Sequence, residues 1–168
     1  MCVRVEEEKL TPMTDQDRQH PTYESPVPFE EDRSGVVAVY CSDGRFGEQC
    51  DDLLHHALGL PTYDRLVIPG GAACLAGYVA AHREESVLLS QMEFLIEAHA
   101  LHQVVLIAHQ DCAFYTSRLR ISQLNLLARQ TEDLAKAAVR VQDLGRHLVV
   151  TAFFAHVDGD VVDFEQLR

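Results

Sequence analysis

The sequence predicts an α/β fold in which a mostly parallel central β-sheet is flanked by helices and carries an added antiparallel C-terminal strand. Two apolar runs rich in β-branched residues, 36–40 and 104–108, have the composition of strands buried on both faces. Stretches with helical spacing of apolar residues separate the strand-like runs. The segment 148–164 contains Asp158-Gly159, a strong signal for a hairpin turn. Strands that alternate with helices up to a final hairpin indicate a parallel sheet with one antiparallel edge.

The elements between the two apolar runs follow from spacing and turn residues. A helix is expected over residues 47–58, followed by a strand over 63–68 that ends at a Pro-Gly-Gly sequence. Residues 73–100 should form one or two helices, with a break near Glu85-Ser86.

A long helix is expected over residues 122–144, because its apolar residues recur at helical spacing and Gly145 follows its end. The predicted apolar stripe consists of Leu124, Leu127, Leu134, Ala138 and Val141.

The chain divides near residue 33. Residues 1–33 contain four prolines and many acidic and amide side chains, so they should form an extended or disordered acidic tail. Residues 34–168 have the length and composition of a single α/β domain.

The composition argues against several classes of function and location. The formal net charge of −12 argues against non-specific binding to nucleic acid or to an anionic membrane, both of which require a positive surface. The sequence has neither an apolar run of membrane-spanning length nor the apolar core of a secretory signal, so a cytoplasmic location is the expectation. Five cysteines without a scaffold pattern argue against disulfides, and Cys50 and Cys74 are expected to be buried free thiols.

Two short motifs directly follow the two apolar runs. Residues 41–45 read Cys-Ser-Asp-Gly-Arg, and residues 109–112 read His-Gln-Asp-Cys. If the runs are parallel strands, both motifs lie at the carboxyl edge of the sheet, where ligand sites form. Cys41, His109 and Cys112 would then make a Cys₂His set that binds one Zn²⁺ per chain and leaves a fourth position open, as in catalytic zinc sites.

Cys-x-Asp-x-Arg followed by His-x-x-Cys resembles the zinc signature of the β-class carbonic anhydrases, and the resemblance extends from about residue 36 to the C-terminus. It implies a β-carbonic anhydrase-like fold and reversible hydration of carbon dioxide to bicarbonate by a zinc-bound hydroxide. The enzyme would be a carbonate dehydratase, a zinc lyase whose substrate is a small molecule. The resemblance also implies a homodimer or higher homo-oligomer.

Asp43 and Arg45 are the candidate catalytic residues. Asp43 could accept a hydrogen bond from zinc-bound water, and Arg45 could hold that carboxylate through a bidentate pair. The resemblance implies this same role, and it also implies that Asp43 can become the fourth metal ligand in a resting state. The alternative is an ion pair that only fixes the loop.

Three further residues are candidates for the pocket. Gly70 and Gly71 could let the backbone approach the site closely or could simply form a tight turn. Asp111 could support the ligands or could cap its loop. Four aromatic residues near the ligands could line an apolar pocket or pack in the core: Tyr40, Phe46, Phe114 and Tyr115.

The sequence departs from the family pattern in three respects. Ala113 follows the second cysteine where the family commonly has Gly, and residues 68–72 replace a polar loop with Ile-Pro-Gly-Gly-Ala. The chain is also short for the family, and the prolines of residues 1–33 argue against the helical arm that the family usually has there. Two other functions therefore stay open: a zinc-dependent hydrolase of a CO₂ analogue such as carbonyl sulfide or carbon disulfide, and a non-catalytic zinc-binding module. A phosphatase- or rhodanese-like loop with Cys41 as nucleophile is disfavoured, because Arg45 follows the cysteine too closely.

Overall fold

Five strands form one sheet in the computed structural model, which describes residues 23–167. The strand order is β2-β1-β3-β4-β5, and only the last pair is antiparallel. The strands are β1 Val36–Cys41, β2 Asp64–Ile68, β3 Gln103–His109, β4 Val149–Asp158 and β5 Val161–Gln166. The predicted fold class is confirmed.

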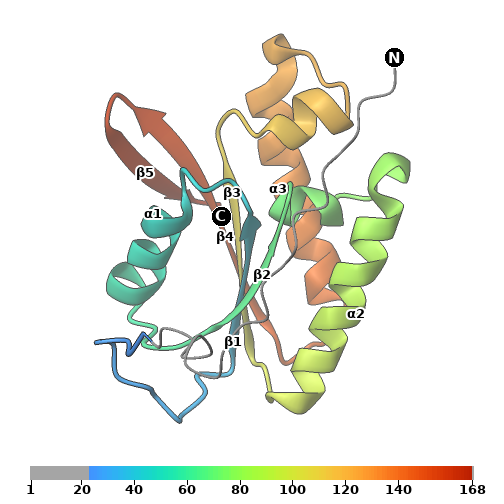
Figure 1. Ribbon diagram of the computed structural model, residues 1–168. Helices are drawn as coiled ribbons and strands as arrows, with labels where there is room; N and C mark the ends of the chain where they lie inside the picture. Colours follow the sequence, from blue (N-terminus) through green and yellow to red (C-terminus); the bar gives the residue numbers. More distant parts are fainter. Residues whose placement is uncertain (1–22, 168) are drawn as a thin grey trace, which may run out of the picture.

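Helices cover both faces of the sheet (Figure 1). Helix α1, Gly47–Asp52, lies on one face and continues into a π-helical turn, Leu53–Ala57. Helices α2, His82–Ala98, and α3, Leu126–Gln142, lie on the other face. The remaining helical segments are short: 3₁₀ turns at Gly71–Leu75, Val79–Ala81 and Gln123–Asn125, and a π-helical turn at Phe114–Arg118.

The two central strands are buried on both faces, as their composition predicts. Val37 and Val39 of β1 belong to the core beneath α2 and α3, which includes Leu88 and Leu134. The alternate β1 residues belong to a second core beneath α1, whose members include Val36, Ala38, Tyr40, Cys50, Leu53 and Leu54. Each fully buried aliphatic side chain contributes about 1.5–3 kcal/mol, so the two cores fix β1 and β3, and the residues at their ends, firmly.

The predicted break near Glu85-Ser86 is wrong, because α2 is continuous through both residues. The Ser86 hydroxyl donates a hydrogen bond back to the His82 carbonyl within the helix, and Glu85 is buried in an ion pair with Arg140 of α3. The chain instead breaks before α2, where Gly77 has a φ of +82°.

The predicted stripe of α3 is partly wrong. Leu124 is 95% exposed and Leu127 is 51% exposed. The helix begins only at Leu126, after a 3₁₀ turn, so the residues before it do not follow the α-helical phase. The buried positions are Leu126, Gln130, Asp133, Leu134, Ala137 and Val141.

The closing hairpin joins β4 and β5. Asp158 pairs with Val161, so the turn residues are Gly159 and Asp160, one position later than predicted. Gly159 has a φ of +60°, a conformation that glycine adopts without strain.

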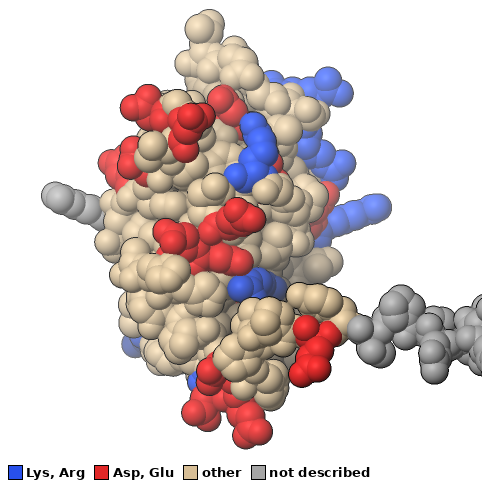
Figure 2. Space-filling view, turned by 60° about the vertical axis from the view of Figure 1, so that its left-hand side comes forward, with Lys and Arg blue, Asp and Glu red and all other residues tan. Residues whose placement is uncertain are grey.

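The described part of the predicted tail, residues 23–33, contains neither helix nor strand and is exposed. Residues 1–22 lie outside the described part of the chain, and the domain boundary stays a prediction. No helix within residues 23–167 has the length and apolar character needed to cross a membrane. On the face shown in Figure 2, acidic side chains form several groups and basic ones are fewer, in keeping with the net charge of −12.

Candidate metal centre

The topology brings the two sequence motifs together. Strand β1 lies between β2 and β3, so the chain leaves β1 toward one side and returns to pair on its other side. Ligand sites form at such a reversal, outside the carboxyl ends of the strands. Cys41 is the last residue of β1, and His109 is the last residue of β3.

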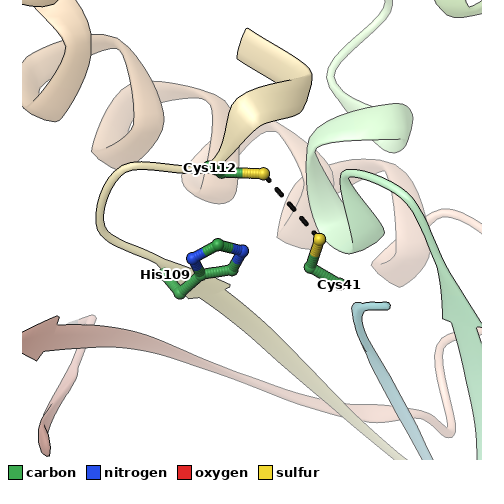
Figure 3. A group of neighbouring side chains, drawn as sticks. All are labelled: Cys41, His109 and Cys112. Carbon is green, nitrogen blue, oxygen red and sulfur yellow. Dashed lines mark hydrogen bonds between the residues drawn. The ribbon is translucent and has the colours of Figure 1, made fainter. Parts of the chain in front are cut away.

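Three side chains that could hold a metal ion converge at this edge (Figure 3). One ligand atom from each of Cys41, His109 and Cys112 lies within 4.8 Å of the other two, and all three residues are buried. The two sulfur atoms are 3.8 Å apart. Two thiolates at tetrahedral zinc distances of about 2.3 Å would lie about 3.8 Å apart, so the observed spacing fits such an ion.

The His109 ring is oriented so that one nitrogen is free. Its Nδ1 is 2.8 Å from the Gln110 carbonyl oxygen, so Nδ1 carries the proton and donates it. Nε2 is buried and has no hydrogen-bond partner within the described residues. A buried acceptor without a partner costs about 1–3 kcal/mol, which coordination of a cation would remove. The Phe46 ring packs against the imidazole, with ring centroids 4.2 Å apart.

The two thiols are electrostatically coupled. A hydrogen bond from Cys112 is the main cause of the lowered pKa of Cys41, with smaller contributions from His109 and from the Gly70 N–H group, which is 3.3 Å from Cys41 Sγ. The same contact with Cys41 and the burial of the thiol raise the pKa of Cys112. Ionisation of one thiol thus disfavours ionisation of the other, and a divalent ion between the sulfurs would allow both to ionise.

The loop after β2 passes directly beside Cys41. Gly70 and Gly71 have φ values of +88° and +48°. A Cβ at Gly71 would overlap the Tyr40 carbonyl carbon and lie 2.5 Å from the Cys41 nitrogen, and one at Gly70 would lie 2.6 Å from the Phe114 ring. The loop is thus a tight turn whose backbone also lies close to Cys41, so both of the roles considered for Gly70 and Gly71 apply.

Asp43 and Arg45 form the bidentate pair that the sequence predicts. Arg45 Nη2 is 2.6 Å from Asp43 Oδ2, and Nε is 3.0 Å from Oδ1. The Arg45 main-chain N–H also donates to Oδ1, at 3.1 Å. These hydrogen bonds hold the pKa of Asp43 at about 2, so the carboxylate is ionised at neutral pH. The side chain of Arg45 is 66% exposed and that of Asp43 is 21% exposed, and Asp43 lies two residues after Cys41, which places the pair at the mouth of the site.

Asp111 behaves differently from Asp43. Its side chain is exposed and makes no hydrogen bond to any residue of the described chain, so neither capping nor support of the ligands is observed. Its backbone has a φ of +55°, a left-handed conformation that Asp adopts more readily than most residues. Asp111 therefore shapes the turn between His109 and Cys112.

The sequence profile of the family described as "Putative carbonic anhydrase" matches residues 31–165. The chain belongs to this family.

Individual relatives are distant. An uncharacterized protein of Rickettsia conorii is 25% identical over 133 residues, which cover 76% of this chain and 70% of that protein. The crystal structure of β-carbonic anhydrase isoform I from Trichomonas vaginalis is similar, with a TM-score of 0.52, 11% identity and coverage of 89% of each chain. A tetrameric β-carbonic anhydrase of Sordaria macrospora gives a TM-score of 0.42 at 14% identity, over 77% of this chain and 79% of that one. The match to the Trichomonas vaginalis enzyme shows that the fold is that of the β-carbonic anhydrases.

Two of the departures from the β-class pattern are accommodated locally. Ala113 has a φ of −60° and is exposed, so a side chain at this position is unstrained. The Pro-Gly-Gly loop approaches Cys41 through its backbone, and the Gly70 N–H group is 3.3 Å from Cys41 Sγ.

The four flanking aromatic residues divide between core and surface. Tyr40, Phe46 and Tyr115 are buried and pack in the core. Phe114 instead helps to line an apolar hollow of about 430 Å³, together with Ile68, Pro69, Arg83, Glu84 and Val87.

One buried residue beside the site is not among the candidates that the sequence motifs indicate. Gln130 of α3 is 1% exposed, and its Nε2 donates a hydrogen bond to the His109 carbonyl at 2.8 Å. The signal that could have found it is its spacing, because Gln130 lies four residues after Leu126 and four before Leu134. A polar residue in the middle of a buried apolar stripe needs a partner.

Proposed function

We propose that the protein is a zinc-dependent carbonic anhydrase, which hydrates carbon dioxide reversibly to bicarbonate. The observation that carries this proposal is the buried convergence of two thiols with the unpartnered Nε2 of His109. The family and the fold support it, since both are carbonic anhydrase-like.

Cys41, His109 and Cys112 would hold the ion. Two thiolates and one imidazole suit Zn²⁺ better than Mg²⁺ or Ca²⁺, which prefer oxygen ligands, and three protein ligands leave one position open. When bound, zinc lowers the pKa of a coordinated water toward neutrality, as it does in carbonic anhydrases of the three-histidine class.

Asp43 would orient the reacting water. Its carboxylate is ionised and at the mouth of the site, so it can accept a hydrogen bond from a water at the open position and direct a lone pair of that water outward. Arg45 occupies both carboxylate oxygens and so fixes the carboxylate plane. Asp43 could also occupy the fourth position itself in a resting state.

The test is stopped-flow CO₂ hydration on protein whose zinc content is measured by mass spectrometry. About one zinc per chain with turnover that rises with pH supports the proposal. One zinc per chain without turnover at any pH contradicts it, and assays with carbonyl sulfide and carbon disulfide then separate an altered substrate from a non-catalytic module.

The water-orienting role has its own test. Asp43→Ala and Arg45→Ala should each keep zinc and lose most of the turnover, by about 100-fold or more. Arg118→Ala is the matched control, because Arg118 forms a comparable exposed pair with Glu84 at 2.7 Å, outside the ligand cluster. Full activity in both Asp43→Ala and Arg45→Ala would exclude the role.

A further inference from the structure

We propose that Gln130 and Gln110 are positioning residues that aim His109 Nε2 at the two thiols and thereby set the affinity of the metal centre. This inference rests on the proposed function, because it concerns the same ligands. Neither glutamine would touch the ion, and each acts through a different part of His109.

Gln130 holds the main chain of His109 from the side of α3. Its amide Nε2 is 2.8 Å from the His109 carbonyl oxygen, and the residue is 1% exposed. Oε1 of the same amide is buried and has no partner within the described residues. An apolar side chain of similar size would avoid burying an oxygen without a hydrogen-bond partner, so the amide is poorly explained by helix packing alone.

The other buried polar residue of α3 shows the contrast. Asp133 is fully buried, but its carboxylate accepts from the Tyr78 hydroxyl at 2.5 Å and lies 3.3 Å from Lys136 Nζ. Asp133 is therefore a satisfied structural anchor. The Gln130 side chain leaves its Oε1 without a partner among the described residues. Its one hydrogen bond, from Nε2, goes to the main chain of His109, a proposed metal ligand.

Gln110 holds the imidazole ring from the side of β4. Its carbonyl oxygen accepts the hydrogen bond from His109 Nδ1 at 2.8 Å. Its own N–H donates to the Ala155 carbonyl at 2.9 Å, and its side-chain Oε1 accepts from the Val157 N–H at 3.2 Å. Both ends of Gln110 are thus tied to β4, and the carbonyl that sets the His109 tautomer has a fixed position.

The two contacts together restrict His109 at its main chain and at its ring. A histidine ligand whose second nitrogen is hydrogen-bonded binds a metal more tightly, because the tautomer and the ring orientation are set before the ion arrives. Loss of either contact would leave the ligands present but less well aimed.

A control of the same chemistry lies on the same helix. Gln142 Nε2 donates to the Gly145 and Leu148 carbonyls at 3.1 and 3.0 Å. It is twelve residues beyond Gln130, or about 18 Å along the helix axis, so it cannot act on His109 directly.

The experiment measures Zn²⁺ affinity by competition with a chelator for the wild type, Gln130→Met, Gln110→Met and Gln142→Met. Unfolding of the metal-free proteins is followed in parallel by chemical denaturation. Gln130→Met should bind zinc about 10- to 100-fold more weakly, and Gln110→Met should show a smaller loss because only its side-chain tie to β4 is removed. Gln142→Met should keep the wild-type affinity even if its metal-free form unfolds more easily.

Bound Co²⁺ gives a second readout, because its visible spectrum depends on ligand geometry. The spectrum should change in Gln130→Met and not in Gln142→Met. Equal zinc affinities and equal Co²⁺ spectra in all the proteins would overturn the positioning role and leave the metal centre intact. Failure of the wild type to bind zinc would overturn the metal centre and this inference with it. If Gln130→Met does not fold, unchanged affinity in Gln110→Met decides against the inference.

Discussion

The segments at the ends of β1 and β3 each contain a cysteine that is a proposed metal ligand, but the two segments are held in place in different ways. The first loop, residues 41–45, is fixed by backbone contact: Gly71 packs directly against Tyr40 and Cys41, where no Cβ could fit. The second loop, residues 109–112, is fixed by polar side chains, because Gln130 and Gln110 tie it to α3 and β4.

The loops also differ in their acidic residues. Asp43 is ordered by Arg45 at the mouth of the site, whereas Asp111 is exposed and makes no hydrogen bond to residues 23–167. The comparison teaches that the proposed ligands are shared between the loops, while the residues proposed to act on the reacting water belong to the first loop alone. Each prediction below tests one side of this division.

The largest expected effect is one that both loops share. Cys41→Ser and Cys112→Ser should each abolish stoichiometric zinc binding and the stabilisation that zinc confers, since binding and folding are coupled. Zinc per chain by mass spectrometry and the melting temperature with and without added zinc measure this. Cys50→Ser and Cys74→Ser are the controls, because both cysteines are equally buried but lie outside the ligand cluster. Zinc retained in either ligand variant would contradict the ligand assignment.

The next effect should be confined to the first loop. Gly71→Ala should lower the free energy of unfolding by about 3–5 kcal/mol, for two reasons. The added Cβ overlaps the Tyr40 backbone, and the φ of +48° at residue 71 is strained for alanine. Gly59→Ala is the control: Gly59 has a φ of +66° with no atom within 4 Å of an added Cβ, so it should cost only about 1–2 kcal/mol. Chemical denaturation measures both. Equal losses would mean that close packing does not hold this loop.

The acidic residues give a third contrast. Asp43→Asn should reduce CO₂ hydration by about 100-fold at unchanged zinc content, because a neutral amide can neither pair with Arg45 nor accept as strongly from water. Asp111→Asn should leave turnover near the wild-type value, since Asn also tolerates the left-handed backbone conformation. Equal activity losses in the two variants would remove the distinction between the loops.

The smallest expected effect concerns pH. The hydrogen bonds from Arg45 lower the pKa of Asp43 from 3.8 to about 2, so the ionised pair is complete above pH 3.8 and is lost only as the pH falls toward 2. The ratio of wild-type to Asp43→Asn turnover should therefore stay constant from about pH 6 to about pH 9, where a carboxylate of this kind does not titrate. Stopped-flow assays across that range measure the ratio. A ratio that falls toward one at the acid end would mean that this carboxyl group titrates there.

The convergence of the three candidate ligands could be predicted because their positions depend on local signals. Two runs of β-branched residues identify the central strands, and parallel strands bring Cys41 and His109 to one edge. The Asp43–Arg45 pair is equally local, since only two residues separate its members.

Features that depend on distant partners could not be predicted in the same way. The continuity of α2 depends on the pairing of Glu85 with Arg140, which lies on another helix. The phase of α3 depends on where its preceding 3₁₀ turn ends, and periodicity alone placed Leu124 on the wrong face. The spacing of Gln130 between Leu126 and Leu134 marks it as buried, but nothing local identifies its partner His109, which lies 21 residues earlier in the chain.

The most direct test of the central claim is X-ray absorption at the zinc edge on wild-type protein loaded with zinc. The ligand set of Cys41, His109 and Cys112 predicts two sulfur atoms at about 2.3 Å, one imidazole nitrogen at about 2.0–2.1 Å and one further light atom. A coordination shell of oxygen and nitrogen atoms without sulfur would contradict the assignment of these three residues as the metal ligands.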